Sequence, residues 1–268
     1  MKRSPLFLHT ATLLRFYVRS RLILAFTIIV FAVWALDLVP LFLFESPAGR
    51  FETLKNVAVQ THGFVWFATA GLGLFAMWAH SAQRSPALVF TRPGRPESWV
   101  GAVFVSAFIV AVVAHAAAAL LTLALSLAWH VPFQAGFIWQ TADAMFESII
   151  IVSALTGLAA ALHPVIAVIA FAVFNEGVFY SLDLMLLGYL QGRPAGLWPR
   201  AAEWFARGIH EAVPMLDPFG DKTAAVASSL RVTSADWGYL AATGAYAALA
   251  FVFFFSFAGL VLRRRPAV

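Results

Sequence analysis

Residues 99–129 read WVGAVFVSAFIVAVVAHAAAALLTLALSLAW, a run that contains no Asp, Glu, Lys or Arg. A transmembrane helix needs about 20 mainly apolar residues to cross a hydrocarbon layer ~30 Å thick. The whole chain of 268 residues is 62% hydrophobic and only 12% charged, whereas a soluble domain is about 25% charged. The run and the composition together predict an all-α membrane protein whose apolar side chains face lipid.

Further stretches outside this run are also long and apolar enough to span a membrane. With it they predict six transmembrane helices, at 22–44, 62–83, 99–129, 142–162, 164–190 and 237–262. The fourth and fifth meet at His163-Pro164, and proline disfavours helix at the residue before it. One uninterrupted helix there would be about 70 Å long at ~1.5 Å per residue, so we expect a hairpin break. The chain is then a single transmembrane domain over residues 1–268.

The charges that flank these stretches orient the chain, because cytoplasmic loops are enriched in Lys and Arg. With Glu97 as the single acid, one side carries Lys2, Arg3, Arg15, Arg19, Arg21, Arg84, Arg92, Arg95, Arg263, Arg264 and Arg265. The other side balances Arg50, Lys55, Arg193, Arg200, Arg207, Lys222 and Arg231 with Glu45, Glu52, Glu203, Glu211, Asp217, Asp221 and Asp236. We therefore expect a multi-pass protein of a bacterial inner membrane with both termini in the cytoplasm.

Two segments outside the spans have helical amphipathicity. Residues 6–20 combine an apolar face with arginines one turn apart, which predicts an interfacial helix; a loosely ordered basic tail is the alternative. In the long outer loop 191–236, apolar residues recur every 3–4 positions over 198–213. Asp221 can cap a second short helix. These short outer helices either gate the protein or lie passively on the outer leaflet.

Several kinds of chemical site are excluded or unsupported by the sequence. The chain has no cysteine, so disulfides, thiolate metal sites and cysteine nucleophiles are excluded. None of its lysines follows glycine, so it has no phosphate-binding P-loop. The seven histidines show no pair at metal-ligand spacing, and we predict no metal site. We expect no enzyme active site and no nucleic-acid partner.

Polar residues inside the apolar stretches are candidates for a transport path. Ionisable groups in a membrane helix are costly, about 2.5–3.5 kcal/mol at the centre on insertion scales, so they face protein or water. A path bounded by the fourth and fifth spans would be lined by His115, Asp143, Glu147, Asn175, Glu176 and Asp183. The alternative is structural, with hydrogen bonds between helices or pairing with arginines of the outer loop.

The stretch between the second and third spans carries the most informative motif. Residues 91–101 read TRPGRPESWVG, a basic, proline-stiffened link in which Pro96 and Glu97 suit the start of a helix. Just before it, residues 85–90 can form a short helix in the plane of the inner surface. Such a helix can dock into a groove on a cytoplasmic partner, although plain positive-inside topology also explains the arginines.

This layout resembles the permease subunits of type-2 ATP-binding-cassette (ABC) exporters. In that family a coupling helix between spans 2 and 3 precedes a Ser/Thr-Arg-Pro-x-x-Arg pattern and a glycine that opens span 3. Here Thr91, Arg92, Pro93, Arg95 and Gly101 match in kind, with one residue instead of two between Pro93 and Arg95. The interfacial helix, six spans and short outer helices match as well.

The resemblance implies a transport subunit rather than an enzyme. Two permease chains, identical or similar, would join two ATP-binding subunits. ATP and Mg would be bound by those subunits, and this chain would need no cofactor. The coupling segment 84–98 would contact them through Arg84, Leu88, Arg92, Pro93, Arg95 and Glu97. Two other classes stay open: a membrane enzyme acting on lipid or peptide, and a non-catalytic membrane assembly protein.

Overall fold

The computed structural model describes residues 4–19, 47–82, 96–173 and 229–264, together with isolated positions within 21–32, 196–204 and 225–226. All regular secondary structure among these residues is helical, which confirms the all-α class. The helices whose first and last residues are both described are α1 Pro5–Arg19, α3 Pro47–Ala82, α5 Pro96–Ala128, α6 Ala135–Ala161, α7 Pro164–Val173 and α11 Ser234–Arg264.

Three of these helices are long and apolar enough to cross a membrane: Glu97–Ala128, Ala135–Ala161 and Ser234–Arg264. They coincide with the predicted spans at 99–129, 142–162 and 237–262. Residues 62–82 of the predicted span 62–83 form the second half of α3, which is not among these three helices. The predicted span at 22–44 lies outside the continuously described residues, as does most of 164–190.

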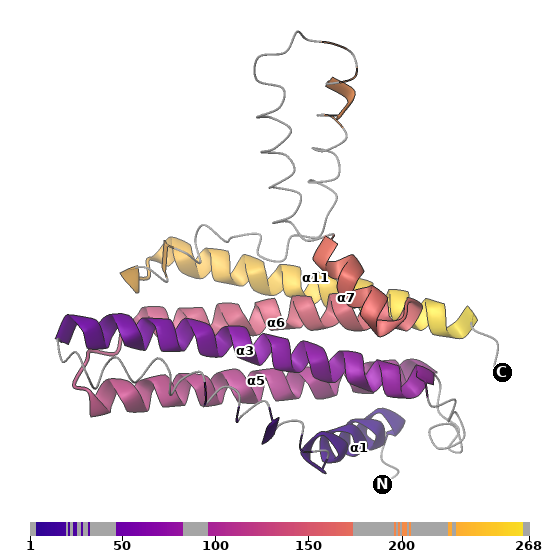
Figure 1. Ribbon diagram of the computed structural model, residues 1–268, viewed down its shortest axis with the longest axis horizontal. Coiled ribbons are helices and arrows are strands. Elements are labelled where there is room, and N and C mark those ends of the chain that lie inside the picture. Colours follow the sequence, from indigo (N-terminus) through magenta and orange to yellow (C-terminus); the bar gives the residue numbers. More distant parts are fainter. Residues whose placement is uncertain are drawn as a thin grey trace.

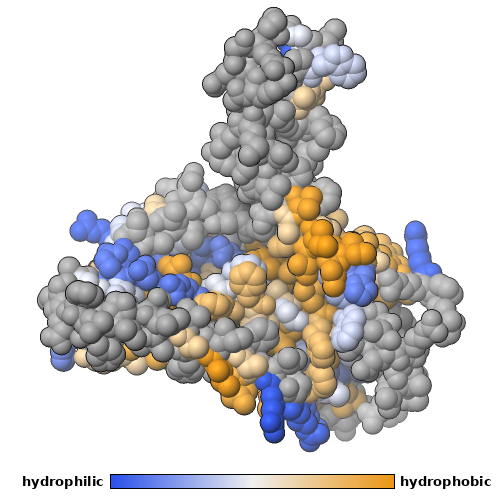
Figure 2. Space-filling view, viewed as in Figure 1, coloured by the Kyte–Doolittle hydropathy of each residue, from blue (hydrophilic) through white to orange (hydrophobic). Residues whose placement is uncertain are grey.

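The break between the fourth and fifth stretches occurs where the proline predicts it. α6 ends at Ala161 and α7 begins at Pro164, and Leu162 adopts an extended backbone. Figure 1 shows α7 turning away from the line of α6. Its side chains gather as a hydrophobic patch in Figure 2, and those exposed are Val165, Ile166, Val168, Ile169 and Val173. A surface of exposed aliphatic side chains is compatible with contact to the acyl chains of lipid.

The four long helices α3, α5, α6 and α11 pack side by side as a bundle (Figure 1). α6 is the central helix, since 67% of its most apolar stretch is buried, against 22% for α5 and for α11. α6 and α11 approach closely at small residues. A Cβ on Gly157 would lie 2.8 Å from Phe254, and a Cβ on Gly244 would lie 2.9 Å from Phe146. Small residues at such crossings are typical of membrane helix packing.

The amphipathic N-terminal segment is a helix that docks on the bundle. Tyr17 of α1 is fully buried, and its hydroxyl lies 3.5 Å from the Leu72 carbonyl and 3.4 Å from Ser106 Oγ. Tyr17 donates its single hydrogen to the Leu72 carbonyl, and Ser106 Oγ donates to the Val103 carbonyl at 3.0 Å, so the contact between the two hydroxyls has no fixed donor. Burial raises the pKa of Tyr17 above its ordinary value, which keeps this donor protonated. The basic helix is thus anchored to α3 and α5.

Candidate functional site

The structure describes four of the predicted site residues. Glu97 is in the first turn of α5, His115 lies in the middle of α5, and Asp143 and Glu147 lie one turn apart in α6. The others lie outside the described residues: Arg84, Leu88, Arg92, Pro93, Arg95, Asn175, Glu176 and Asp183. For those residues both the coupling role and the path role stay predictions.

His115 belongs to a hydrogen-bonded chain that joins three helices. Its Nδ1 lies 2.9 Å from Nδ1 of His62 in α3, and its Nε2 lies 2.7 Å from Ser148 Oγ in α6. The other ring nitrogen of His62 lies 3.3 Å from Thr141 Oγ1. All four side chains are buried. The chain therefore ties α3, α5 and α6 together through polar contacts inside the bundle.

The contacts fix which nitrogen of each ring carries hydrogen. Thr141 Oγ1 donates to the Phe137 carbonyl at 2.8 Å, so it accepts from His62 Nε2–H. His62 Nδ1 is then an acceptor, and His115 Nδ1 must be the donor. His115 Nε2 is left to accept from Ser148. With one hydrogen on each ring, every donor in the chain faces an acceptor.

Sequence spacing did not reveal this pairing. His62 and His115 are 53 positions apart, whereas ligand pairs within one helix are recognised at three or four. Only the register between α3 and α5 brings them together. No group of three or more His, Cys, Asp or Glu side chains among the described residues is placed to hold a metal ion. The histidine pair is therefore described by its hydrogen bonds alone.

Beside this chain lies a pocket of about 260 Å³ between α3 and α6. It is lined by Val59, His62, Gly63 and Trp66 from α3 and by Gln140, Asp143, Ala144 and Glu147 from α6. Both sets recur at three- and four-residue spacing, so each is one face of its helix. Two of the predicted path residues, Asp143 and Glu147, thus share a pocket whose other wall is α3.

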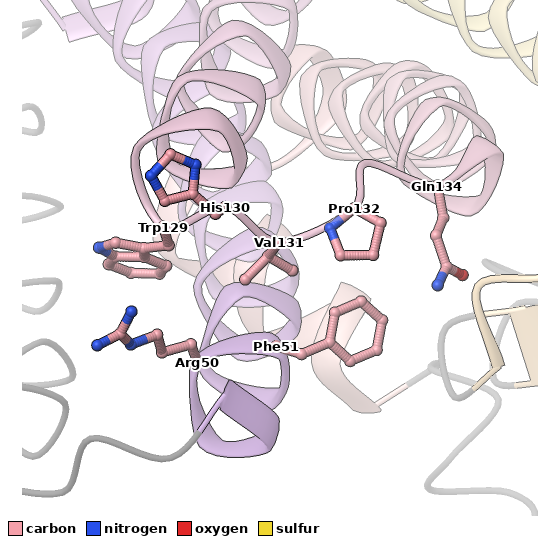
Figure 3. A pocket seen from close by; sticks show the side chains of 7 residues that line it. All are labelled: Arg50, Phe51, Trp129, His130, Val131, Pro132 and Gln134. Atoms are coloured by element: carbon pink, nitrogen blue, oxygen red, sulfur yellow. The ribbon is translucent and has the colours of Figure 1, made fainter.

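A second pocket, of about 430 Å³, lies at the end of the bundle where α5 passes into α6 (Figure 3). Arg50 and Phe51 project from α3 toward the link residues 129–134. His130 closes α5 with a left-handed backbone (φ 55°), and Val131 N–H donates to the Ser126 carbonyl at 2.9 Å. This helix end shapes the pocket, and among the described residues that line it Arg50 is the one Lys, Arg, Asp or Glu.

The opposite end of the bundle holds the basic helix and an ion pair. Glu97, at the start of α5, contacts the guanidinium of Arg263, near the end of α11. α1 docks on α3 and α5 close by, with His9 and Trp99 ring centroids 5.8 Å apart. Figure 1 shows the end of α3, the start of α5, α1 and the end of α11 together at this end.

Comparison of the chain with protein-family models, with curated proteins and with solved structures found no match. The functional argument therefore depends on the residues and their geometry.

Proposed function

We propose that this chain is the transmembrane subunit of an ATP-driven exporter of the type-2 ABC class. It spans the membrane six times with both termini in the cytoplasm. It forms the substrate path, and a separate subunit binds and hydrolyses ATP. One observation carries the proposal. The end of α3, the start of α5, the basic helix α1 and the end of α11 lie together at one end of the bundle (Figure 1).

That end has the features that a docking platform for a cytoplasmic ATPase needs. α3 ends and α5 begins at the end of the bundle where α1 and the arginines of α11 lie (Figure 1). Tyr17 anchors α1 to both helices that flank the link, and Glu97 ties α5 to α11. A force applied to the link would therefore act on a connected set of helices.

A pull-down with charge-reversal variants tests this proposal. The tagged chain, purified from native membranes in mild detergent, is expected to bring with it a P-loop ATPase in equal amount. The double variant Arg92→Glu, Arg95→Glu should reduce ATPase recovery at least tenfold, because it reverses the charge of the proposed docking segment. Recovered ATPase is measured by quantitative mass spectrometry and by ATP hydrolysis.

The matched control makes the same charge change at two arginines of the predicted outer loop 191–236. Arg200→Glu, Arg231→Glu should leave ATPase recovery within about twofold of the native chain. A chain that purifies alone under conditions that preserve other ABC complexes would contradict the proposal. An equal loss of ATPase recovery in both double variants would mean that charge reversal itself disrupts the protein. That result would contradict a specific docking role for Arg92 and Arg95.

A second candidate function is a membrane hydrolase acting on lipid or peptide. It is favoured by one observation, the 2.7 Å contact of Ser148 Oγ with His115 Nε2, whose other nitrogen contacts His62. In enzymes with a serine nucleophile, the serine, a histidine base and a third group that orients the histidine are arranged in this way, as Ser148, His115 and His62 are here. However, Ser148 and His115 are both 0% exposed, and neither lines the adjacent pocket. A substrate carbonyl would have no space beside Ser148, so the transport proposal has better support.

A further inference from the structure

The basic helix α1 runs alongside the first turns of α5. Near the start of α1, the ring centroids of His9 and Trp99 are 5.8 Å apart. Near its end, the Tyr17 hydroxyl lies 3.4 Å from Ser106 Oγ. From Trp99 to Ser106 is about 10 Å along α5 at ~1.5 Å per residue. α1 is therefore packed beside this stretch of α5 over most of its own length (Figure 1).

The length of α5 places this stretch at the depth of lipid headgroups. Trp99 lies in the first turn of α5, and Trp129 follows its last residue. Tryptophan is enriched at both membrane–water interfaces. The two residues are about 45 Å apart along the helix, which matches the ~40–45 Å thickness of a bilayer with its headgroups. Because the hydrocarbon core takes up ~30 Å of that thickness, the first ~8 Å after Trp99 lie in the headgroup layer.

Two arginines of α1 point away from the bundle at this depth. Arg15 and Arg19 are exposed, and each is two residues from the buried Tyr17, which is ~200° around a helix. They are one turn apart and share a face. Neither has a hydrogen bond or ion pair with a residue that the structure describes. The sequence holds no acid before Asp37, so the two guanidinium groups are free to bind an anion.

The chemistry of the two arginines selects a phosphate with net negative charge around it. A guanidinium group forms two parallel charge-assisted hydrogen bonds to phosphate oxygens. A zwitterionic lipid places its own ammonium beside the phosphate, and that ammonium repels the arginines. An anionic phospholipid has no such group. Charge complementarity therefore favours the anionic headgroup.

Exposed apolar side chains beside the arginines favour a lipid over a free anion. Phe7 is 55% exposed and Val18 is 70% exposed, and the two lie three turns apart on one face next to Arg15. Phe16, on the other flank, is 41% exposed and is held by stacking on Phe75 of α3, with ring centroids 5.7 Å apart. Acyl chains of a lipid would cover these side chains, whereas a bound inorganic phosphate would leave them exposed.

We infer that α1 holds an anionic phospholipid, with its phosphate on Arg15 and Arg19 and its acyl chains against Phe7, Phe16 and Val18. This goes beyond the interfacial position that the amphipathic sequence predicts, because the docked helix offers a site on the protein for one class of lipid. Binding requires no ATPase, so the site stands or falls independently of the transport role.

Titration of the full-length, delipidated chain in detergent with two matched lipids tests the inference. The probes are dioleoylphosphatidylglycerol and dioleoylphosphatidylcholine, which share their acyl chains and differ in headgroup charge. Native mass spectrometry resolves the first bound lipid and gives its dissociation constant. The anionic lipid is expected to bind at least about tenfold more tightly, because each arginine near an anionic lipid strengthens binding about fivefold.

Charge-removing and charge-keeping variants locate the site. Arg15→Gln, Arg19→Gln should weaken phosphatidylglycerol binding at least about tenfold and leave phosphatidylcholine binding within about twofold. Both side chains are exposed, so the fold should be retained. Arg15→Lys, Arg19→Lys keeps the charge but loses the bidentate geometry, and should weaken binding only about threefold. The matched control Arg264→Gln, Arg265→Gln removes the same charge from the C-terminal arginines and should change binding less than about twofold.

Four results would overturn the inference. Equal affinity for the two lipids would show that the headgroup charge is not recognised. Full phosphatidylglycerol binding by Arg15→Gln, Arg19→Gln would place the lipid elsewhere on the protein. An equal loss in Arg264→Gln, Arg265→Gln would reduce the effect to net charge. Displacement of phosphatidylglycerol by an excess of inorganic phosphate would show that α1 binds a free anion and not a lipid.

Discussion

Tyr17→Ala is expected to lower the free energy of unfolding by about 3–5 kcal/mol, the range for removing a large aromatic side chain from a core. Tyr17 is fully buried between α1, α3 and α5, and it belongs to the largest described apolar cluster, with Leu72, Val103 and Phe104 among its members. Its removal leaves a cavity and takes away the hydroxyl contact with Ser106. The loss can be measured by steric trapping in bicelles.

Two neighbouring substitutions separate this effect from a general sensitivity of α1. Tyr17→Phe keeps the ring and should cost only about 0.5–1.5 kcal/mol, the net contribution of one hydrogen bond. Val18 is 70% exposed, and Val18→Ala should stay within about 0.5 kcal/mol of the native chain. Similar small losses for all three would show that α1 is not docked through Tyr17.

Gly136→Ala is expected to detach the segment before α11 from the start of α6. A Cβ on Gly136 would lie 2.5 Å from the Leu230 Cα and 2.6 Å from its carbonyl oxygen. Backbone cannot rotate away as a side chain can. The substitution would also break the hydrogen bond from Gly136 N–H to that oxygen, 3.1 Å long. We expect a loss of about 1–3 kcal/mol, the usual cost of overpacking a core.

The detachment has a local signature as well as a global one. The chain has no cysteine, so Val226→Cys gives a single thiol at a position that is 2% exposed. Gly136→Ala should speed maleimide labelling of this thiol at least tenfold. Gly238→Ala, where a Cβ meets nothing within 4 Å, should leave labelling unchanged. Unchanged labelling in Gly136→Ala would contradict the observed contact between Gly136 and Leu230.

The features that sequence predicted well are local ones. The break at His163-Pro164 depends on one steric rule, and α6 and α7 end and begin beside it. The helical N-terminal segment follows from its amphipathic spacing. α3 begins at Pro47, well before the predicted span at 62–83. The prediction started too late because Glu52 and Lys55 lower the hydropathy of the first turns of this helix. These two residues pair with each other at i and i+3, which lets the helix continue through them.

The candidate site depends on contacts between distant parts of the chain, which one sequence does not reveal. Asp143 and Glu147 were recognisable as acids in an apolar stretch. Their neighbours His62 and Trp66 come from α3 and are assigned to the pocket only by the packing of α3 against α6. The histidine pair has the same origin. A path between the fourth and fifth spans remains a prediction for Glu176, which lies outside the described residues.

Single-cysteine labelling tests the central claim, that the bundle crosses a membrane with α1 in the cytoplasm. Ser4, His130 and Ser229 are exposed, and each is replaced singly by cysteine in the cysteine-free chain. In intact cells, a membrane-impermeant maleimide should label His130→Cys and Ser229→Cys. It should label Ser4→Cys only in inverted vesicles. Labelling of Ser4→Cys in intact cells, or of all three from the same side, would contradict the account.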